Sequence, residues 1–177
     1  MYDVVIFFVR ETGNMEIWDA YNEDGSLAGC DLSRGEPIPD GLYHLACEIL
    51  VKHTDESYLL TQRDFLKADF PGMFEATAGG SALKGETPLR AAIRELKEET
   101  GIAANELTPI CDPFIEGKGL YYCFLCVTDC SKTSIILQDG ETISYSWLAR
   151  DEFLDFVNSD KCIPSQKDRL LSYLSSE

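Results

Sequence analysis

One short segment, residues 87–101, constrains the fold of this chain more than any other. Thr87 and Pro88 form a typical helix start, because threonine caps the first turn and proline suits the first helical position. Gly101 is a typical helix stop, since glycine readily takes the left-handed conformation. Between these ends an apolar stripe recurs at helical spacing, formed by Leu89, Ile93 and Leu96. The segment is predicted to be a helix that buries this stripe.

Three glutamates lie on a different face of the same helix. Glu95, Glu98 and Glu99 fall at positions i, i+3 and i+4, so their side chains share one side. Like charges at this spacing repel by about a few tenths of a kcal/mol per pair, which disfavours an isolated helix. Convergent carboxylates are, however, the ligands that a hard cation such as Mg2+ or Mn2+ requires. Taken alone, this face is either solvated surface or a metal site.

The remaining sequence is predicted to form several short strands and two short helices. Short amphipathic helices are expected at residues 150–158 and about 165–174. The expected strands are 4–9, 15–21, 42–52, 57–62, 74–78, 107–111, 120–127 and 142–147. The strands 42–52 and 57–62 are predicted to pair as a hairpin. We expect one domain over residues 1–177, with an N-terminal strand or hairpin extension over 1–41. Strands interleaved with few helices indicate the α/β (α+β) class, folded as a sandwich.

The composition narrows the class of partner and the compartment. Lys and Arg number 15 against 31 Asp and Glu, which gives a net charge of -16. This balance argues against binding to nucleic acid or anionic membranes, since both need clustered cations.

No apolar run reaches the roughly 20 residues of a transmembrane helix, and the N-terminus lacks the cationic region of a signal peptide. Seven cysteines, an odd number, predict reduced thiols and a cytoplasmic location.

Three of the cysteines have the spacing of half a zinc site. Cys123, Cys126 and Cys130 follow a C-x2-C-x3-C pattern, but no second pair or nearby histidine completes four ligands. They begin within an apolar, strand-like segment. We therefore expect them to be core residues.

A fixed spacing surrounds the predicted helix. It runs from Gly80 across five residues to Glu86, and then across seven residues to the run that begins at Arg94 and ends at Ile102. Written out, the pattern is Gly-x5-Glu-x7-Arg-Glu-U-x-Glu-Glu-x-Gly-U, where U is a bulky aliphatic residue. The chain therefore resembles the Nudix hydrolase family at every fixed position of the Nudix box.

The resemblance implies a fold and a metal site. Nudix proteins hold a mixed sheet between helices in an α/β/α sandwich, and the box forms a loop-helix-loop that binds metal and the substrate diphosphate. Glu98 and Glu99 are implied as the principal Mg2+ ligands, with Mn2+ as an alternative. Glu95 is implied as a further ligand or as the base that activates water. Arg94 would hold the catalytic carboxylates in place by ion pairing, a role that suits its planar fork.

Further site residues are implied around the helix. Glu86 would anchor or tune the metal site from the loop, and the Gly80 carbonyl would reach the metal. Glu141 precedes a strand that ends in tryptophan, as an acidic residue does in a late Nudix segment; it is a candidate metal ligand or general base, or else a solvated glutamate. Arg63 and Lys67 are candidates for binding a substrate phosphate, with ordinary surface charge as the alternative.

Features upstream of the box resemble the subgroup related to isopentenyl-diphosphate isomerase. They are residues 16–21, His44, 59–63, Lys67 and 70–72. True isomerases carry a catalytic cysteine and a metal-binding histidine just before the helix, whereas residues 74–81 here contain neither. Isomerase activity is therefore disfavoured. His44 matches an isomerase ligand position, but we favour a structural role for it within a strand.

The activity implied is metal-dependent hydrolysis of the diphosphate linkage of a nucleoside diphosphate derivative. A different class, a Nudix-fold module that binds or senses a nucleotide without cleaving it, typically shows a degraded acidic set, and the set here is intact.

The expected partner is a small diphosphate molecule, and a homodimer is common in the family. The choice of substrate depends on loops such as 34–41 and 113–119, and the sequence leaves it open.

Overall fold

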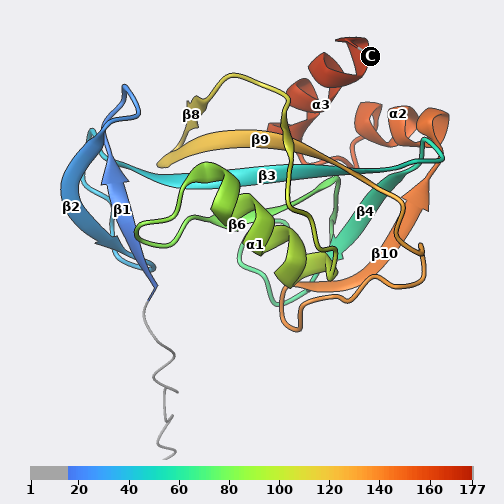
Figure 1. The fold of residues 1–177 in the computed structure, drawn as a ribbon, viewed down its shortest axis with the longest axis horizontal. Coiled ribbons are helices and arrows are strands. Elements are labelled where there is room, and N and C mark those ends of the chain that lie inside the picture. The colour runs from blue at the N-terminus through green and yellow to red at the C-terminus, as the bar shows by residue number, and fades with distance from the viewer. Residues whose placement is uncertain (1–15, 177) are drawn as a thin grey trace, which may run out of the picture.

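The computed structural model describes residues 16–176 as one mixed sheet with helices packed against it (Figure 1). The strand predicted over residues 4–9 lies outside this range. The strands are β1 Ile17–Tyr21, β2 Leu27–Ser33, β3 Tyr43–His53, β4 Tyr58–Arg63, β5 Phe74–Glu75, β6 Thr77–Ser81, β7 Thr108–Pro109, β8 Phe114–Glu116, β9 Gly119–Thr128 and β10 Thr142–Leu148. The helices are α1 Pro88–Thr100, α2 Arg150–Asn158 and α3 Pro164–Ser176. None of these helices is long and apolar enough to cross a membrane.

Strand β3 is the centre of the sheet. It pairs antiparallel with β1, β4 and β6, and parallel with β9 from His44 opposite Gly119 to His53 opposite Thr128. Alternate side chains of a strand point to opposite faces, and β3 buries apolar side chains on both of its faces. Leu45, Cys47, Ile49 and Val51 share one buried cluster with Leu96 of α1, whereas Leu50 packs with residues of α2 and α3.

Helices thus cover both faces of the sheet, with α1 on one side and α2 and α3 on the other (Figure 1). This confirms the predicted α+β sandwich with a mixed sheet. Cys123 and Cys126 are buried in β9, as expected of core residues, and Cys130 is half-buried in the loop that follows.

Some sequence-based expectations about local structure were wrong. The apolar stripe of α1 is only partly buried: Leu96 is fully buried, but Leu89 is 38% exposed. Small residues face the sheet instead, because Ala91 and Ala92 let the helix approach closely. The hairpin predicted from 42–52 and 57–62 is present but short, because β3 and β4 pair antiparallel at Lys52 and Tyr58 beside the turn and then diverge.

Two strands had no clear sequence signal. β2 is mostly exposed, with Leu32 its one buried residue, so it lacks a regular apolar alternation. It pairs with β1 to form an N-terminal hairpin with its own small cluster of Trp18, Ala20 and Leu32. β8 lies within the segment expected to be a loop and pairs with the start of β9.

Candidate active site

Helix α1 is set in place by its two ends, both as predicted. The Thr87 hydroxyl accepts a hydrogen bond from the Arg90 amide at 3.3 Å, and Pro88 is the first helical residue. At the other end Gly101 takes a left-handed conformation with φ 74°, and its amide donates to the Lys97 carbonyl. These caps fix which side chains of the helix face strand β6.

Glu99 points into the fold and meets the backbone of β6. Its side chain accepts a hydrogen bond from the Gly79 amide at 2.9 Å, and the residue is only 9% exposed. A Cβ atom at position 79 would lie 2.1 Å from the Cys47 carbonyl oxygen, so only glycine fits there. The pKa of Glu99 is raised to about 8, chiefly by burial and in smaller part by the nearby carboxylates Glu75 and Glu95, against the opposing hydrogen bond from the Gly79 amide. The protein alone therefore does not stabilise the charged form of Glu99.

Glu95 lies over Gly80. A Cβ atom at position 80 would lie 2.7 Å from both Cδ and Oε1 of Glu95, so the carboxylate occupies space that only glycine leaves free. Burial raises the pKa of Glu95, and the ion pair with Arg94 opposes that rise. Two adjacent glycines therefore let two carboxylates of α1 approach one strand.

Arg94 ties the acidic residues together. Its Nε and Nη2 atoms donate to the two carboxylate oxygens of Glu86, both at 2.9 Å, while Nη1 donates to Glu95 at 2.7 Å and to Glu98 at 3.0 Å. Nη2 also donates to the Ser81 carbonyl at 3.0 Å. Burial alone would raise the pKa of Glu86, but the hydrogen bonds from Arg94 and from the Leu83 amide lower it overall. Glu86 thus occupies an anchoring position.

Two cations line the same cavity as the α1 carboxylates, Arg63 at the end of β4 and Lys67 in the segment after it. Lys67 forms an ion pair with Glu141, and Arg63 forms one with Glu75 at 3.0 Å. Arg63 also donates through Nε to the Asp69 carbonyl at 3.0 Å. Burial raises the pKa of Glu75, and Arg63 opposes the rise.

These groups line one cavity of about 260 Å³, which we call the acid cavity. It collects eight of the nine site residues expected from the sequence, namely Arg63, Lys67, Gly80, Arg94, Glu95, Glu98, Glu99 and Glu141. Glu86 is not among its lining residues. Sequence reasoning missed Glu16, Arg34 and Gln138, which also line the cavity. The segments 16–21 and 34–41 contain Glu16 and Arg34, but no sequence pattern assigned these side chains or Gln138 to the site.

The donor set of the acid cavity suits a hard divalent cation. Three carboxylates of α1 reach it, and the raised pKa of Glu99 marks charge that such a cation would offset. Within residues 16–176, no group of three His, Cys, Asp or Glu side chains is arranged in a form that could hold a metal. The hydrogen bonds explain this, because Arg94 holds Glu95 and Glu98, and Gly79 holds Glu99. Metal binding would require these side chains to exchange partners.

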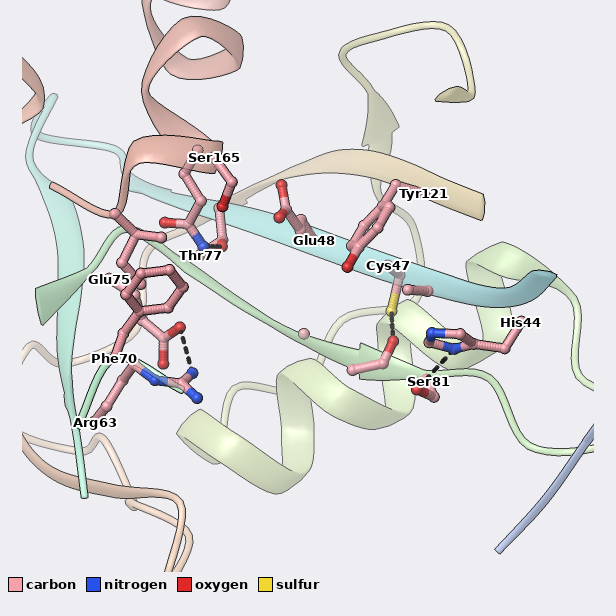
Figure 2. A pocket seen from close by; sticks show the side chains of 15 residues that line it. His44, Cys47, Glu48, Arg63, Phe70, Glu75, Thr77, Ser81, Tyr121 and Ser165 are labelled. Atoms are coloured by element: carbon pink, nitrogen blue, oxygen red, sulfur yellow. Dashed lines mark hydrogen bonds and ion pairs between the residues drawn. The ribbon is translucent and has the colours of Figure 1, made fainter. Parts of the chain in front are cut away.

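A second cavity of about 240 Å³ adjoins the first, and we call it the side cavity. The two share Arg63, Gly79, Gly80 and Ser81. Figure 2 shows polar side chains converging on the side cavity from β3, β6, β9 and the start of α3, among them Glu48, Thr77, Tyr121 and Ser165. It has room for part of a small molecule that extends out of the acid cavity.

His44 lies at the edge of the side cavity (Figure 2). Its Nδ1 is 3.1 Å from the Ser81 hydroxyl, and its ring stacks on Trp18 with centroids 4.6 Å apart. Burial lowers the pKa of His44. These contacts agree with a structural role in a strand.

Comparison with known proteins places the chain in a family. A model of the NUDIX domain matches residues 42–168. The chain belongs to the Nudix family. An uncharacterized Nudix hydrolase of Listeria monocytogenes is 31% identical over 153 residues, covering 85% of this chain and 89% of the relative. The uncharacterized Nudix hydrolase YfcD of Escherichia coli K12 is 32% identical over 154 residues, covering 81% and 79%. The chain is thus a Nudix pyrophosphohydrolase, of a family that acts on nucleotide diphosphate derivatives.

Solved structures agree on the Nudix fold. The crystal structure of DR0079 from Deinococcus radiodurans matches with a TM-score of 0.70 at 18% identity, covering 86% of this chain and 96% of that one. The NUDIX domain of Shewanella oneidensis NrtR, solved with ADP ribose, matches with a TM-score of 0.56 at 15% identity, covering 76% and 87%. The segment that matches the NUDIX family leaves out the β1–β2 hairpin and most of α3.

Proposed function

We propose that this Nudix protein is a Mg2+-dependent hydrolase that cuts the diphosphate linkage of a nucleoside diphosphate derivative with an activated water. One observation carries the proposal: Glu95, Glu98 and Glu99 line one cavity together with cationic side chains, among them Arg63 and Lys67. A diphosphate would be repelled by these carboxylates alone, and by a net charge of -16. The cavity therefore suits a diphosphate only together with a divalent cation.

The residues have separate roles in this proposal. Glu98 and Glu99 would hold Mg2+, with Glu95 beside them; when bound, the cation neutralises phosphate charge and lowers the pKa of water. Arg94 keeps Glu95 and Glu98 on the cavity side of α1 through its hydrogen bonds. A carboxylate within reach of the water takes its proton. Glu95 and Glu141 are the two candidates for this base.

Substrate binding draws on both cavities. Lys67 and Arg63 would bind phosphate oxygens, for which charge-assisted hydrogen bonds are suited. The group beyond the diphosphate would lie in the side cavity, among Glu48, Thr77 and Tyr121. ADP ribose in the NrtR NUDIX domain is one ligand with this general form, a diphosphate joined to a sugar. We propose a cytoplasmic enzyme that acts on small molecules of this kind.

The isomerase alternative gains no support from the side chains present. Gly79, Gly80 and Ser81 occupy the strand before the helix. Cys47 is the one cysteine that lines either cavity, and burial raises the pKa of its thiol to about 12, so it stays protonated. Its Sγ donates to the Gly80 carbonyl at 3.5 Å. This thiol is better explained as packing.

The test is product release from a panel of sugar nucleotides, dinucleotides, nucleoside diphosphates and prenyl diphosphates, with and without Mg2+. Glu98→Gln removes one proposed ligand from an exposed position, so it should lose most activity while the fold is kept. Glu106→Gln, at an exposed site away from the cavity, is the matched control. Turnover that needs Mg2+ and fails only in Glu98→Gln supports the proposal. Tight binding without turnover across the panel would favour a nucleotide-binding module instead.

A further inference from the structure

The N-terminal hairpin brings a cation to the acid cavity. Glu16, just before β1, and Arg34, just after β2, both line that cavity. Both lie outside residues 42–168, the segment that matches the NUDIX family. The match to the NUDIX family model therefore assigns them no role, and their place in the cavity comes from the fold of this chain.

Arg34 and Glu16 are held to each other at the open end of the hairpin. The Arg34 amide donates to the Glu16 carbonyl at 3.0 Å, and Nη1 of Arg34 donates to both carboxylate oxygens of Glu16, at 2.8 and 3.0 Å. Their strands are in register there, with Ile17 opposite Ser33. The backbone and the side chains thus fix where the guanidinium lies.

The hairpin itself is fastened to the box loop and to β3. The Lys84 amide donates to the Ile17 carbonyl at 2.8 Å, and the Gly85 amide donates to the Asp19 carboxylate at 2.6 Å. On the other side Ala20 pairs with His44, and Trp18 stacks on the His44 ring. Arg34 is therefore presented to the cavity by an ordered element.

Arg34 keeps more free donors than the other guanidinium groups of the cavity. Among the described residues, only its Nη1 has a side-chain partner, which leaves Nε and Nη2 available. In contrast, all three nitrogens of Arg94 are hydrogen-bonded, and two of the three in Arg63 are. The Arg34 side chain is 56% exposed, so a ligand in the cavity can reach it.

We propose that Arg34 binds the diphosphate of the substrate through Nε and Nη2, and that Glu16 is the positioning residue that holds its guanidinium. Two parallel N–H donors match two phosphate oxygens, which a lysine at the same site would not reproduce. The N-terminal hairpin then adds a cation to the substrate site, to which the segment after β4 contributes Lys67. This inference rests on the proposed function, because the acid cavity must hold a diphosphate.

The test compares Arg34→Ala with Lys84→Ala. Lys84 forms an equally exposed ion pair with Asp31 of the same hairpin, at 2.6 Å, but does not line the acid cavity, so it controls for loss of charge and of hairpin docking. With the best substrate of the panel, Arg34→Ala should raise KM about tenfold or more with a smaller change in kcat. Arg34→Lys should recover only part of this. Glu16→Gln should raise KM less than Arg34→Ala does.

A binding measurement separates this inference from the proposed hydrolysis. Calorimetry with methylenediphosphonate and Mg2+ measures affinity for the diphosphate group without turnover. Arg34→Ala should weaken binding about tenfold, and Lys84→Ala should leave it unchanged. Equal affinity in wild type and Arg34→Ala would overturn the role of Arg34, as would a wild-type protein that does not bind this probe. Absence of Mg2+-dependent turnover would instead overturn the hydrolase, while the binding comparison still decides the role of Arg34.

Discussion

Arg94 and Glu86 form a bidentate pair, with Nε to Oε1 and Nη2 to Oε2 both at 2.9 Å. The pair joins the loop of the Nudix box to its helix, and the side chains are only 23% and 20% exposed. The remaining Arg94 nitrogen reaches Glu95 and Glu98. One guanidinium therefore fixes both the loop and the carboxylates proposed to bind Mg2+.

Replacing Arg94 by lysine should harm activity more than stability. An ammonium cannot serve Glu86, Glu95 and Glu98 together, so the carboxylates lose their alignment. We expect Arg94→Lys to lower kcat/KM at least about tenfold and the unfolding free energy by roughly 1–2 kcal/mol. Arg90→Lys, on the same helix but outside the acid cavity, should change neither. Full activity in Arg94→Lys would show that the bidentate geometry is dispensable.

The sequence predicted the ends of α1 well because local chemistry decides them. Thr87 and Gly101 act within one turn of the chain, and the box spacing carries Glu95 and Glu99 to one side of the helix. Which face is buried depends on the sheet, and this explains the exposure of Leu89. No local pattern could predict Arg34, since only the folded hairpin brings it to the cavity.

Glu99→Gln should stabilise the metal-free protein. Burial raises the folded-state pKa of Glu99 to about 8, whereas the unfolded chain titrates near 4.5. The contribution of Glu99 to the free energy of unfolding is therefore fully present below the unfolded-state pKa of 4.5 and is lost as the pH rises through about 8. Above pH 4.5 the unfolded chain releases its proton, whereas the folded state must either keep that proton or bury a charge. Glutamine is neutral and can still accept from the Gly79 amide. Near neutral pH, in a chelator, the variant should be more stable by on the order of a few kcal/mol.

Added Mg2+ should reverse that order. The wild type gains stability by binding the cation, and Glu99→Gln gains little because it lacks one ligand. Thermal unfolding with chelator and with millimolar Mg2+ measures both effects. If wild type and Glu99→Gln respond equally to Mg2+, Glu99 is not a ligand.

Gly80→Ala should act through Glu95. The added Cβ atom would lie 2.7 Å from the Glu95 carboxylate, so that side chain must leave its place. We expect Gly80→Ala to lower both activity and stability in the wild-type background. In a Glu95→Ala background the clash is absent, and the same substitution should cost almost no further stability. A double-mutant cycle of unfolding free energies measures this coupling. Additive effects would place the cost of Gly80→Ala in the backbone.

Arg169→Ala should destabilise the fold from the side away from α1. Arg169 donates to both oxygens of Glu48, at 3.1 and 2.7 Å, and through Nη1 to Glu116 at 2.8 Å. Its guanidinium also stacks on Phe114, 4.8 Å from the ring centroid. Removing it leaves Glu48, whose side chain is 14% exposed, without a cation. A loss of roughly 2–4 kcal/mol in unfolding free energy is expected.

The pH dependence and a second substitution identify the cause of that loss. Burial already raises the pKa of Glu48, and Arg169 opposes the rise. Without Arg169 the pKa rises further, so the loss should shrink at mildly acidic pH, where Glu48 takes up a proton. Glu48→Gln in the Arg169→Ala background should recover part of the stability, because it removes the unpaired charge. Lys167→Ala removes a cation of the same helix that donates only to the Asn158 carbonyl among the described contacts, and it should cost no more than about 1 kcal/mol. A loss in Arg169→Ala that neither pH nor Glu48→Gln alters would assign it to the lost stacking on Phe114.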